Sequence, residues 1–266
     1  MTSHDRGEIT ALVSTMFEGS GLRDAGAGRP VLVLHGGGGV PTVAGLSQSL
    51  SATTRVLMPT HPGFDGTIRP AWLHSVAELA RFYLALLDRL EIDEIVVVGS
   101  SIGGWIGSEM ALQAPGRIAG LVLINAVGIA VEGHPLVDIS QLPLPALMQL
   151  AYHDPAKAMT SAPPPSPQLQ EMRAANAAAL AAYDNGVNMQ DSGLRASLAD
   201  VVAPVLVLWG ESDGIGSPHY GAAYADAFAN GVFELIPEAG HLPQIEQPAR
   251  VSASIGSFLR QLDGAS

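Results

Sequence analysis

Ser101, Asp213 and His241 are three residues whose types could together perform nucleophilic chemistry. A serine hydroxyl is a poor nucleophile until a base accepts its proton, and a histidine does this well when a carboxylate holds its ring. Each of the three residues comes shortly after an apolar run of strand length. Because loops at the carboxyl ends of parallel strands meet at one edge of a sheet, we expect these side chains to lie together.

Ser101 is the centre of the sequence Gly99-Ser100-Ser101-Ile102-Gly103, which matches the pattern G-x-S-x-G. The pattern lies between a predicted strand, 94–98, and a predicted helix, 102–113, which is the strand–turn–helix context of a nucleophile elbow. Glycines at such a sharp turn let neighbouring backbone segments approach each other. A glycine-rich helix N-terminus that only packs tightly or binds a phosphate is the alternative interpretation.

A run of glycines follows another predicted strand, in His35-Gly36-Gly37-Gly38-Gly39. Such a run lets backbone N–H groups face a ligand, and with the N–H of Ile102 it could form an oxyanion hole. A simple turn or a phosphate loop are the alternatives. Position 57 is leucine, where a dinucleotide fingerprint needs an acidic residue, so the glycines do not complete that fingerprint. No Lys-Ser/Thr pair follows them either, so a P-loop is excluded.

Short apolar runs alternate with longer helical patterns along most of the chain. The runs are continuous rather than alternating, as expected for strands that are covered on both faces. The predicted strands are Pro30–Leu34, Thr54–Met58, Glu94–Val98, Leu121–Asn125, Val205–Trp209 and Val232–Ile236. Alternation of this kind predicts an α/β fold with a mostly parallel sheet and helices on both faces. Residues 9–17 could add one or two antiparallel strands at an edge.

Residues 128–199 break the alternation. They contain no good strand pattern, a cluster of prolines, and an alanine-rich helix predicted over Gln168–Tyr183. We expect this segment to be a helical cap over the strand ends, inserted into a core made of residues 1–127 and 200–266. A flexible linker between domains is the alternative.

Composition excludes several function classes. The 266 residues include 25 acidic and 13 basic side chains, a formal net charge of −12, which argues against a nucleic-acid partner. No cysteine is present, so disulfides, cysteine nucleophiles and thiolate metal sites are excluded. The longest apolar runs are too short to span a membrane, and residues 1–8 do not resemble a signal peptide. We therefore expect a cytoplasmic protein that acts on a small molecule, and both a monomer and a homo-oligomer are compatible with the sequence.

Taken in order, the motifs resemble those of the α/β-hydrolase superfamily, whose triad runs serine, acid, histidine along the chain. The motifs that carry the resemblance are His35–Gly39, His61-Pro62-Gly63-Phe64, Gly99–Gly104, Trp209–Asp213 and Gly240-His241. The sequence is most similar to capped hydrolases with an HGGG-type loop, which include carboxylesterases and meta-cleavage-product hydrolases. This resemblance implies a mostly parallel, eight-stranded-type sheet with a helical cap.

The same resemblance assigns a role to each candidate residue. Ser101 would be the nucleophile, His241 the base and then the acid, and Asp213 the residue that orients the imidazole. Gly37 and Ile102 would supply the oxyanion N–H groups. The implied activity is cleavage of a small to medium, largely apolar ester through an acyl-enzyme, without a metal or a cofactor. The alternatives are carbon–carbon bond hydrolysis, cofactor-free haloperoxidase or perhydrolase chemistry, and a non-catalytic receptor.

Some positions depart from the family pattern. Asn125 stands where some relatives carry the acid, and a neutral amide cannot take that role. Leu242 follows His241, where carbon–carbon hydrolases usually carry tryptophan, and the only arginines of the expected cap are Arg173 and Arg195. Asp65 follows the second motif, and the sequence assigns it no role.

Overall fold

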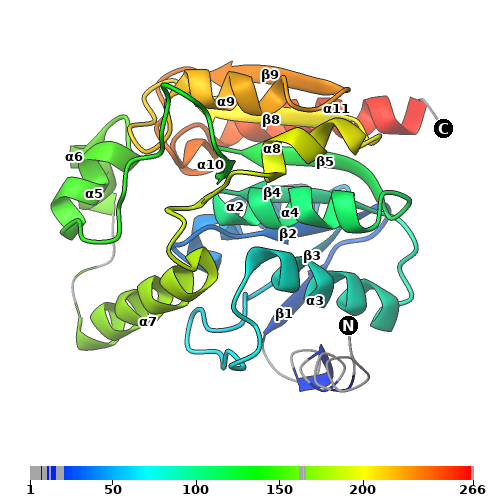
Figure 1. The fold of residues 1–266 in the computed structure, drawn as a ribbon, viewed down its shortest axis with the longest axis horizontal. Helices are drawn as coiled ribbons and strands as arrows, with labels where there is room; N and C mark the ends of the chain where they lie inside the picture. Colours follow the sequence, from blue (N-terminus) through cyan, green and yellow to red (C-terminus); the bar gives the residue numbers. More distant parts are fainter. Residues whose placement is uncertain are drawn as a thin grey trace.

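The computed structural model describes residues 7, 11, 13–15, 21–161, 164 and 166–264. In this part of the chain, seven strands form one sheet in the order β1-β3-β2-β4-β5-β8-β9. The edge strand β1 runs antiparallel to β3, and the other neighbours are parallel (Figure 1). The predicted α/β fold with a mostly parallel sheet is confirmed, with seven strands described rather than the eight of the full family type.

Each of the six predicted strands overlaps a strand of the observed sheet, whereas β1 was not predicted. The strands of the main sheet are β1 (Leu22–Ala25), β2 (Pro30–Leu34), β3 (Arg55–Pro59), β4 (Ile95–Ser100), β5 (Ile118–Ile124), β8 (Val205–Gly210) and β9 (Gly231–Ile236). The helices that surround it are η1 (Val40–Thr42), α2 (Ala44–Leu50), α3 (Val76–Arg89), α4 (Ile102–Gln113), α9 (Pro218–Ala225), α10 (Pro243–Glu246) and α11 (Pro248–Gly264).

The expectation of antiparallel strands over residues 9–17 is wrong where the structure describes them. Ala11 and residues 13–15 are helical, and the other positions of this segment lie outside the described residues. Val13 is buried in the hydrophobic cluster that also holds α3, and the Thr15 hydroxyl donates to the Ala11 carbonyl at 3.0 Å. Burial on the core therefore outweighs the strand propensity of this β-branched segment.

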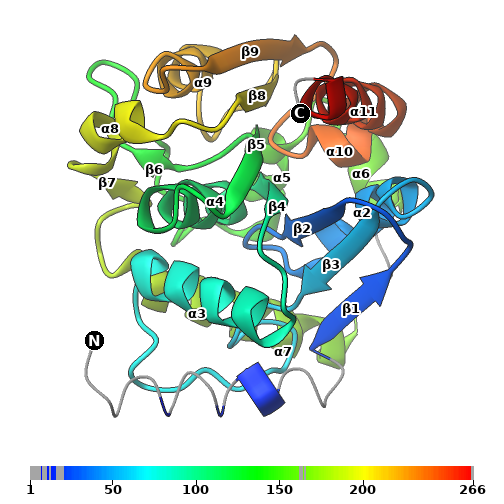
Figure 2. The same cartoon turned by 90° about the vertical axis from the view of Figure 1, so that its right-hand side faces the viewer.

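Two hydrophobic layers cover the sheet. Alternate residues of each central strand face opposite sides: Leu32 belongs to the cluster with α3, α4 and α9, while Val31 belongs to the cluster with α2 and α11. Leu121 and Val122 of β5 divide between the two clusters in the same way. Figure 2 shows these helices on the two sides of the sheet. Burial on both faces explains why the strands are continuous apolar runs.

Between β5 and β8 the chain forms a segment of 72 residues, 128–199, which we call the insertion. It contains β6 (Gly128–Ile129), α5 (Leu144–Ala151), α6 (Pro155–Ser161), α7 (Pro167–Asp184), β7 (Gln190–Asp191) and α8 (Leu194–Ser197), and η2 (Leu198–Asp200) follows. Figure 1 shows α5, α6 and α7 at one end of the sheet. No strand was predicted here, and β6 and β7 form only a two-residue parallel pair.

Helix α7 has clear signals at both ends. The Ser166 hydroxyl accepts the Leu169 N–H at 3.2 Å, Pro167 occupies the first turn, and Asn185 ends the helix in the left-handed conformation. Its buried residues, Asn176, Ala179 and Tyr183, are spaced by three and four positions and so share one face. We call the side of α7 that carries these residues the α7 face.

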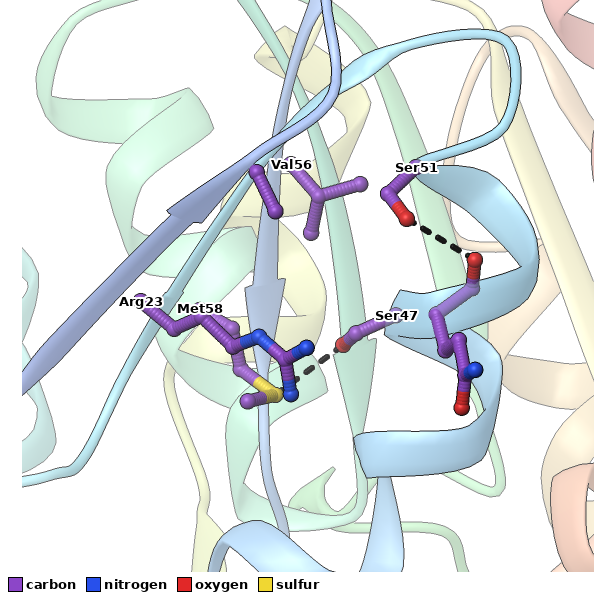
Figure 3. Close-up of a pocket in the computed structure, with 7 residues that line it drawn as sticks. Arg23, Ser47, Ser51, Val56 and Met58 are labelled. Atoms are coloured by element: carbon purple, nitrogen blue, oxygen red, sulfur yellow. Dashed lines mark hydrogen bonds between the residues drawn. The ribbon is translucent and has the colours of Figure 1, made fainter.

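A small cavity lies between β1, β3 and α2 (Figure 3). There the Ser47 hydroxyl donates to the Met58 sulfur at 3.0 Å. None of the predicted site residues lines this cavity. Across the described residues, no helix combines the length and apolar character needed to cross a membrane.

Candidate active site

Ser101 occupies a sharp turn between β4 and α4. Its φ and ψ are 55° and −119°, a conformation that a residue with a side chain rarely adopts. A Cβ added at Gly99 would lie 2.2 Å from the Gly103 carbonyl oxygen, and one at Gly103 would lie 2.3 Å from the Leu34 carbonyl oxygen. The glycines of the G-x-S-x-G motif are therefore required by backbone packing, which gives this short pattern its structural meaning.

Asp213 and His241 are in direct contact. The His241 Nδ1 lies 2.8 Å from the Asp213 Oδ2, and the Asp213 side chain is fully buried. The other carboxylate oxygen of Asp213 accepts the N–H groups of Ile215 at 2.8 Å and Gly216 at 3.2 Å. Because an ionised carboxylate only accepts hydrogen bonds, Nδ1 carries the proton and Nε2 of the neutral ring is left as an acceptor. This is the tautomer that a general base needs.

Asn125 shares the Asp213 carboxylate with His241. Its Nδ2 donates to Asp213 Oδ2 at 2.7 Å, and its Oδ1 accepts the Gly210 N–H at 3.2 Å. Asn125 is fully buried at the end of β5, next to Ile124, whose carbonyl accepts the Ser101 N–H at 2.9 Å. The residue thus connects the acid loop to the elbow, a role that its chemical type alone did not reveal.

The glycine loop after β2 packs directly against the elbow. A Cβ at Gly36 would lie 3.2 Å from the Ser101 Cβ, so these backbones are in contact. The Gly36 carbonyl accepts the Gly39 N–H at 3.0 Å and also lies 2.8 Å from the His35 Nδ1. Since the carbonyl and N–H of one trans peptide point in opposite directions, these contacts orient the Gly37 N–H away from His35. Ile102 is the first residue of α4, so its N–H has no partner within the helix.

Two buried histidines support this loop. The His61 N–H donates to His35 Nε2 at 2.9 Å, so the proton of His35 is on Nδ1, from which it donates to the Gly36 carbonyl. The His61 Nε2–H donates to the His35 carbonyl at 2.9 Å, and its Nδ1 accepts from the Tyr83 hydroxyl. Burial lowers the pKa of His35 to about 4, and burial with the adjacent His35 lowers the pKa of His61 well below its ordinary value. Both rings are therefore neutral near pH 7.

The insertion reaches both loops of the acid–base pair. The Leu150 carbonyl accepts the Gly214 N–H at 2.9 Å, and the Ala151 carbonyl accepts the His241 N–H at 2.8 Å. The Glu246 carboxylate accepts the backbone N–H groups of His153 at 3.0 Å and Gly240 at 2.7 Å. The end of α5 is thus joined to the backbone of Gly214, which follows Asp213, and to that of His241.

The other predicted features have mixed outcomes. Within the described part of the structure, the Ser101 hydroxyl makes no hydrogen bond to His241. Arg173 and Arg195 are both exposed. No group of three or more histidine, aspartate or glutamate side chains among the described residues is placed to hold a metal ion.

Comparisons with known proteins show the family to which the chain belongs. A model of the alpha/beta hydrolase family matches residues 31–254. A 2-hydroxymuconate semialdehyde hydrolase from Pseudomonas sp. (strain CF600) is 27% identical over 278 aligned residues, covering 92% of this chain and 91% of the relative. A thermophilic esterase structure from Thermogutta terrifontis superposes with a TM-score of 0.71 at 25% identity, covering 91% of this chain and 93% of that one.

A meta-cleavage product hydrolase from Pseudomonas fluorescens IP01 has the same fold, with a TM-score of 0.73 at 20% identity over 90% of this chain and 93% of that one. The relatives thus include both esterases and meta-cleavage product hydrolases, and the family model spans most of the sequence. The chain belongs to the alpha/beta hydrolase family.

Proposed function

We propose that this hydrolase cleaves a small to medium, largely apolar carboxylic ester through an acyl-enzyme. Ser101 is the nucleophile, His241 the base and then the acid, and Asp213 orients the imidazole. The observation that carries the proposal is the buried Asp213–His241 pair, joined at 2.8 Å, at the same edge of the sheet as the Ser101 elbow. This chemistry needs no metal or cofactor.

The reaction follows from the positions of the protons. His241 Nε2 accepts the Ser101 proton while Oγ attacks the ester carbonyl carbon, and the resulting imidazolium is stabilised by Asp213. The N–H groups of Gly37 and Ile102 donate to the oxyanion. The alcohol leaves with the proton from His241, and water then hydrolyses the acyl-enzyme by the same steps. The Ser101 hydroxyl must first come within hydrogen-bond distance of the His241 ring.

We assign the role of a cap to the insertion, over a core of residues 1–127 and 200–266. Its contacts with Gly214 and His241, and the position of Leu180 over Gly37, support this assignment. An apolar substrate is favoured because all three basic residues of the insertion, Lys157, Arg173 and Arg195, are exposed rather than set in a buried pocket for a carboxylate. The net charge of −12 also disfavours anions at long range.

Carbon–carbon bond hydrolysis is the second candidate. It is favoured by the similarity to the 2-hydroxymuconate semialdehyde hydrolase, which covers 92% of this chain. The exposed arginines weigh against it, since a diketo acid carries a carboxylate that has to be held near the serine.

Hydrolysis of p-nitrophenyl acetate and butyrate by the wild-type protein, Ser101→Ala and Ser100→Ala tests the proposal. We expect turnover by the wild-type protein, retention of most of it in Ser100→Ala, and its loss in Ser101→Ala. Undiminished hydrolysis in Ser101→Ala would show that the nucleophile is wrongly assigned. Rapid loss of a coloured dienolate substrate without ester turnover would favour the second candidate.

A further inference from the structure

Asp65 joins three segments that are far apart in the sequence. Its Oδ2 accepts the Val40 N–H at 2.8 Å, directly after the glycine loop. Its Oδ1 accepts from the Asn176 Nδ2 of α7 at 2.9 Å, and its own N–H donates to the Asn176 Oδ1 at 2.7 Å. Asn176 is only 3% exposed. Asp65 and Asn176 thus form two reciprocal hydrogen bonds with each other. Asp65 forms a third with the loop that carries the proposed oxyanion donor.

The glycine loop is packed so closely against Asp65 and Asn176 that its backbone has no room to move toward them. A Cβ at Gly39 would lie 2.3 Å from the Asp65 Oδ1 and 2.8 Å from the Asn176 Nδ2, and Gly39 has a φ of 80°. The loop backbone is therefore in van der Waals contact with both side chains. A run of four glycines has high conformational freedom, so its geometry depends on contacts of this kind.

The rest of the same α7 face covers the glycine loop and the loop after β3, which contains Pro62 and Gly63. A Cβ at Gly37 would lie 3.0 Å from the Leu180 Cδ2, and one at Gly63 would lie 3.1 Å from the Ala179 Cβ. The Tyr183 hydroxyl donates to the Pro62 carbonyl at 2.9 Å. Apolar contacts hold α7 near the loops without fixing its register, whereas the hydrogen bonds of Asn176 and Tyr183 are directional. Of these, only the Asn176 bonds reach the residue that accepts the Val40 N–H.

We propose that Asp65 and Asn176 are positioning residues, which make the place of the Gly37 N–H depend on the docking of α7. The inference rests on the proposed function, because it gives this N–H its role. Loss of the pair frees the Val40 N–H and lets the glycine loop sample other conformations. Removal of an oxyanion donor costs about 10²–10³ in kcat, and a misplaced donor costs less, so we expect a loss of about 10- to 100-fold.

Two variants separate the pair from simple packing. Asn176→Asp has nearly the same shape but removes the donor to Asp65 and places two carboxylates face to face. The double variant Asp65→Asn with Asn176→Asp exchanges the two groups. The new amide at position 65 can accept the Val40 N–H and donate to the new carboxylate, which still accepts the backbone N–H of position 65. Every hydrogen bond is regained, so function should return. Gln170→Ala, at an exposed position of the same helix, is the control.

Two measurements on the full chain test the inference: kcat and KM for p-nitrophenyl acetate, and hydrogen exchange of the backbone over residues 35–43. We expect Asn176→Asp to lower kcat about 10- to 100-fold, to change KM for this small ester less than about twofold, and to speed exchange of the loop. The double variant should reverse both effects, and Gln170→Ala should change neither. Equal kcat in the wild-type protein and Asn176→Asp, or no rescue by the double variant, would overturn the inference.

The exchange measurement separates this inference from the proposed function. If the wild-type protein shows no Ser101-dependent hydrolysis, the proposed function fails, and exchange alone decides the role of the pair. Faster exchange over residues 35–43 in Asn176→Asp that the double variant reverses supports the role. Unchanged exchange overturns it, whatever the activity.

Discussion

Acid should destabilise this protein through its buried histidines, and His35→Gln tests how much. His35 is fully buried, and its Nε2 accepts the His61 N–H, so the folded protein has no place for a second proton on this ring. In the unfolded chain its pKa returns to about 6.5, against about 4 in the folded state. This difference corresponds to about 3 kcal/mol.

The direction follows from which state binds the proton. Above about pH 6.5 the ring is neutral in both states, and the full stability is present. As the pH falls, the unfolded chain takes up a proton that the folded protein does not, so the free energy of unfolding decreases until about pH 4. Between about pH 7 and about pH 4.5, His35 alone should remove about 2 kcal/mol. His61, whose pKa is also lowered by burial, adds a loss of the same sign.

Urea unfolding of the wild-type protein and His35→Gln at these two pH values measures the effect. A glutamine can still accept the His61 N–H but does not titrate. We expect the variant to be less stable at about pH 7, yet to lose about 2 kcal/mol less on acidification than the wild-type protein does. His74→Gln, the same change at an exposed position, is the control. Equal losses in the wild-type protein and His35→Gln would refute the reasoning.

Two further predictions concern catalysis. Asp213→Asn should lower kcat for p-nitrophenyl butyrate about 10⁴-fold with little change in KM, because the amide selects the wrong tautomer of His241. A drop of less than tenfold would contradict the role of Asp213 in orienting the imidazole. Asn125→Ala should lower kcat roughly tenfold. It should also lower the free energy of unfolding by about 1–3 kcal/mol, because the buried Gly210 N–H loses its acceptor. Unchanged urea unfolding of this variant would count against the prediction.

Sequence patterns predicted the elements that local chemistry determines. The central strands of the sheet were found because burial on both faces makes them continuous apolar runs, whereas the partly exposed edge strand β1 was not predicted. Helix α4 was found with the same bounds as observed. The elbow was recognisable because the close approach of Gly99 and Gly103 to the backbone admits only glycine. The order of Ser101, Asp213 and His241, each after a strand, was enough to expect them at one edge of the sheet.

The connections between distant segments could not be predicted in the same way. Asp65 and Asn176 are 111 positions apart, and neither belongs to a pattern that names the other as its partner. Asn125 was set aside as an acid because an amide cannot carry the charge, yet an amide can donate to the acid that does. Such contacts depend on how α7 and the loops pack in three dimensions, which spacing along the chain does not encode.

Covalent labelling with a fluorophosphonate tests the central claim most directly, because a stable adduct forms only at a serine that is activated by its neighbours. Digestion and mass spectrometry then locate the adduct. The account predicts one adduct, on Ser101, whose formation is strongly slowed in His241→Ala. An adduct on another residue, or no adduct on a folded wild-type protein, would contradict it.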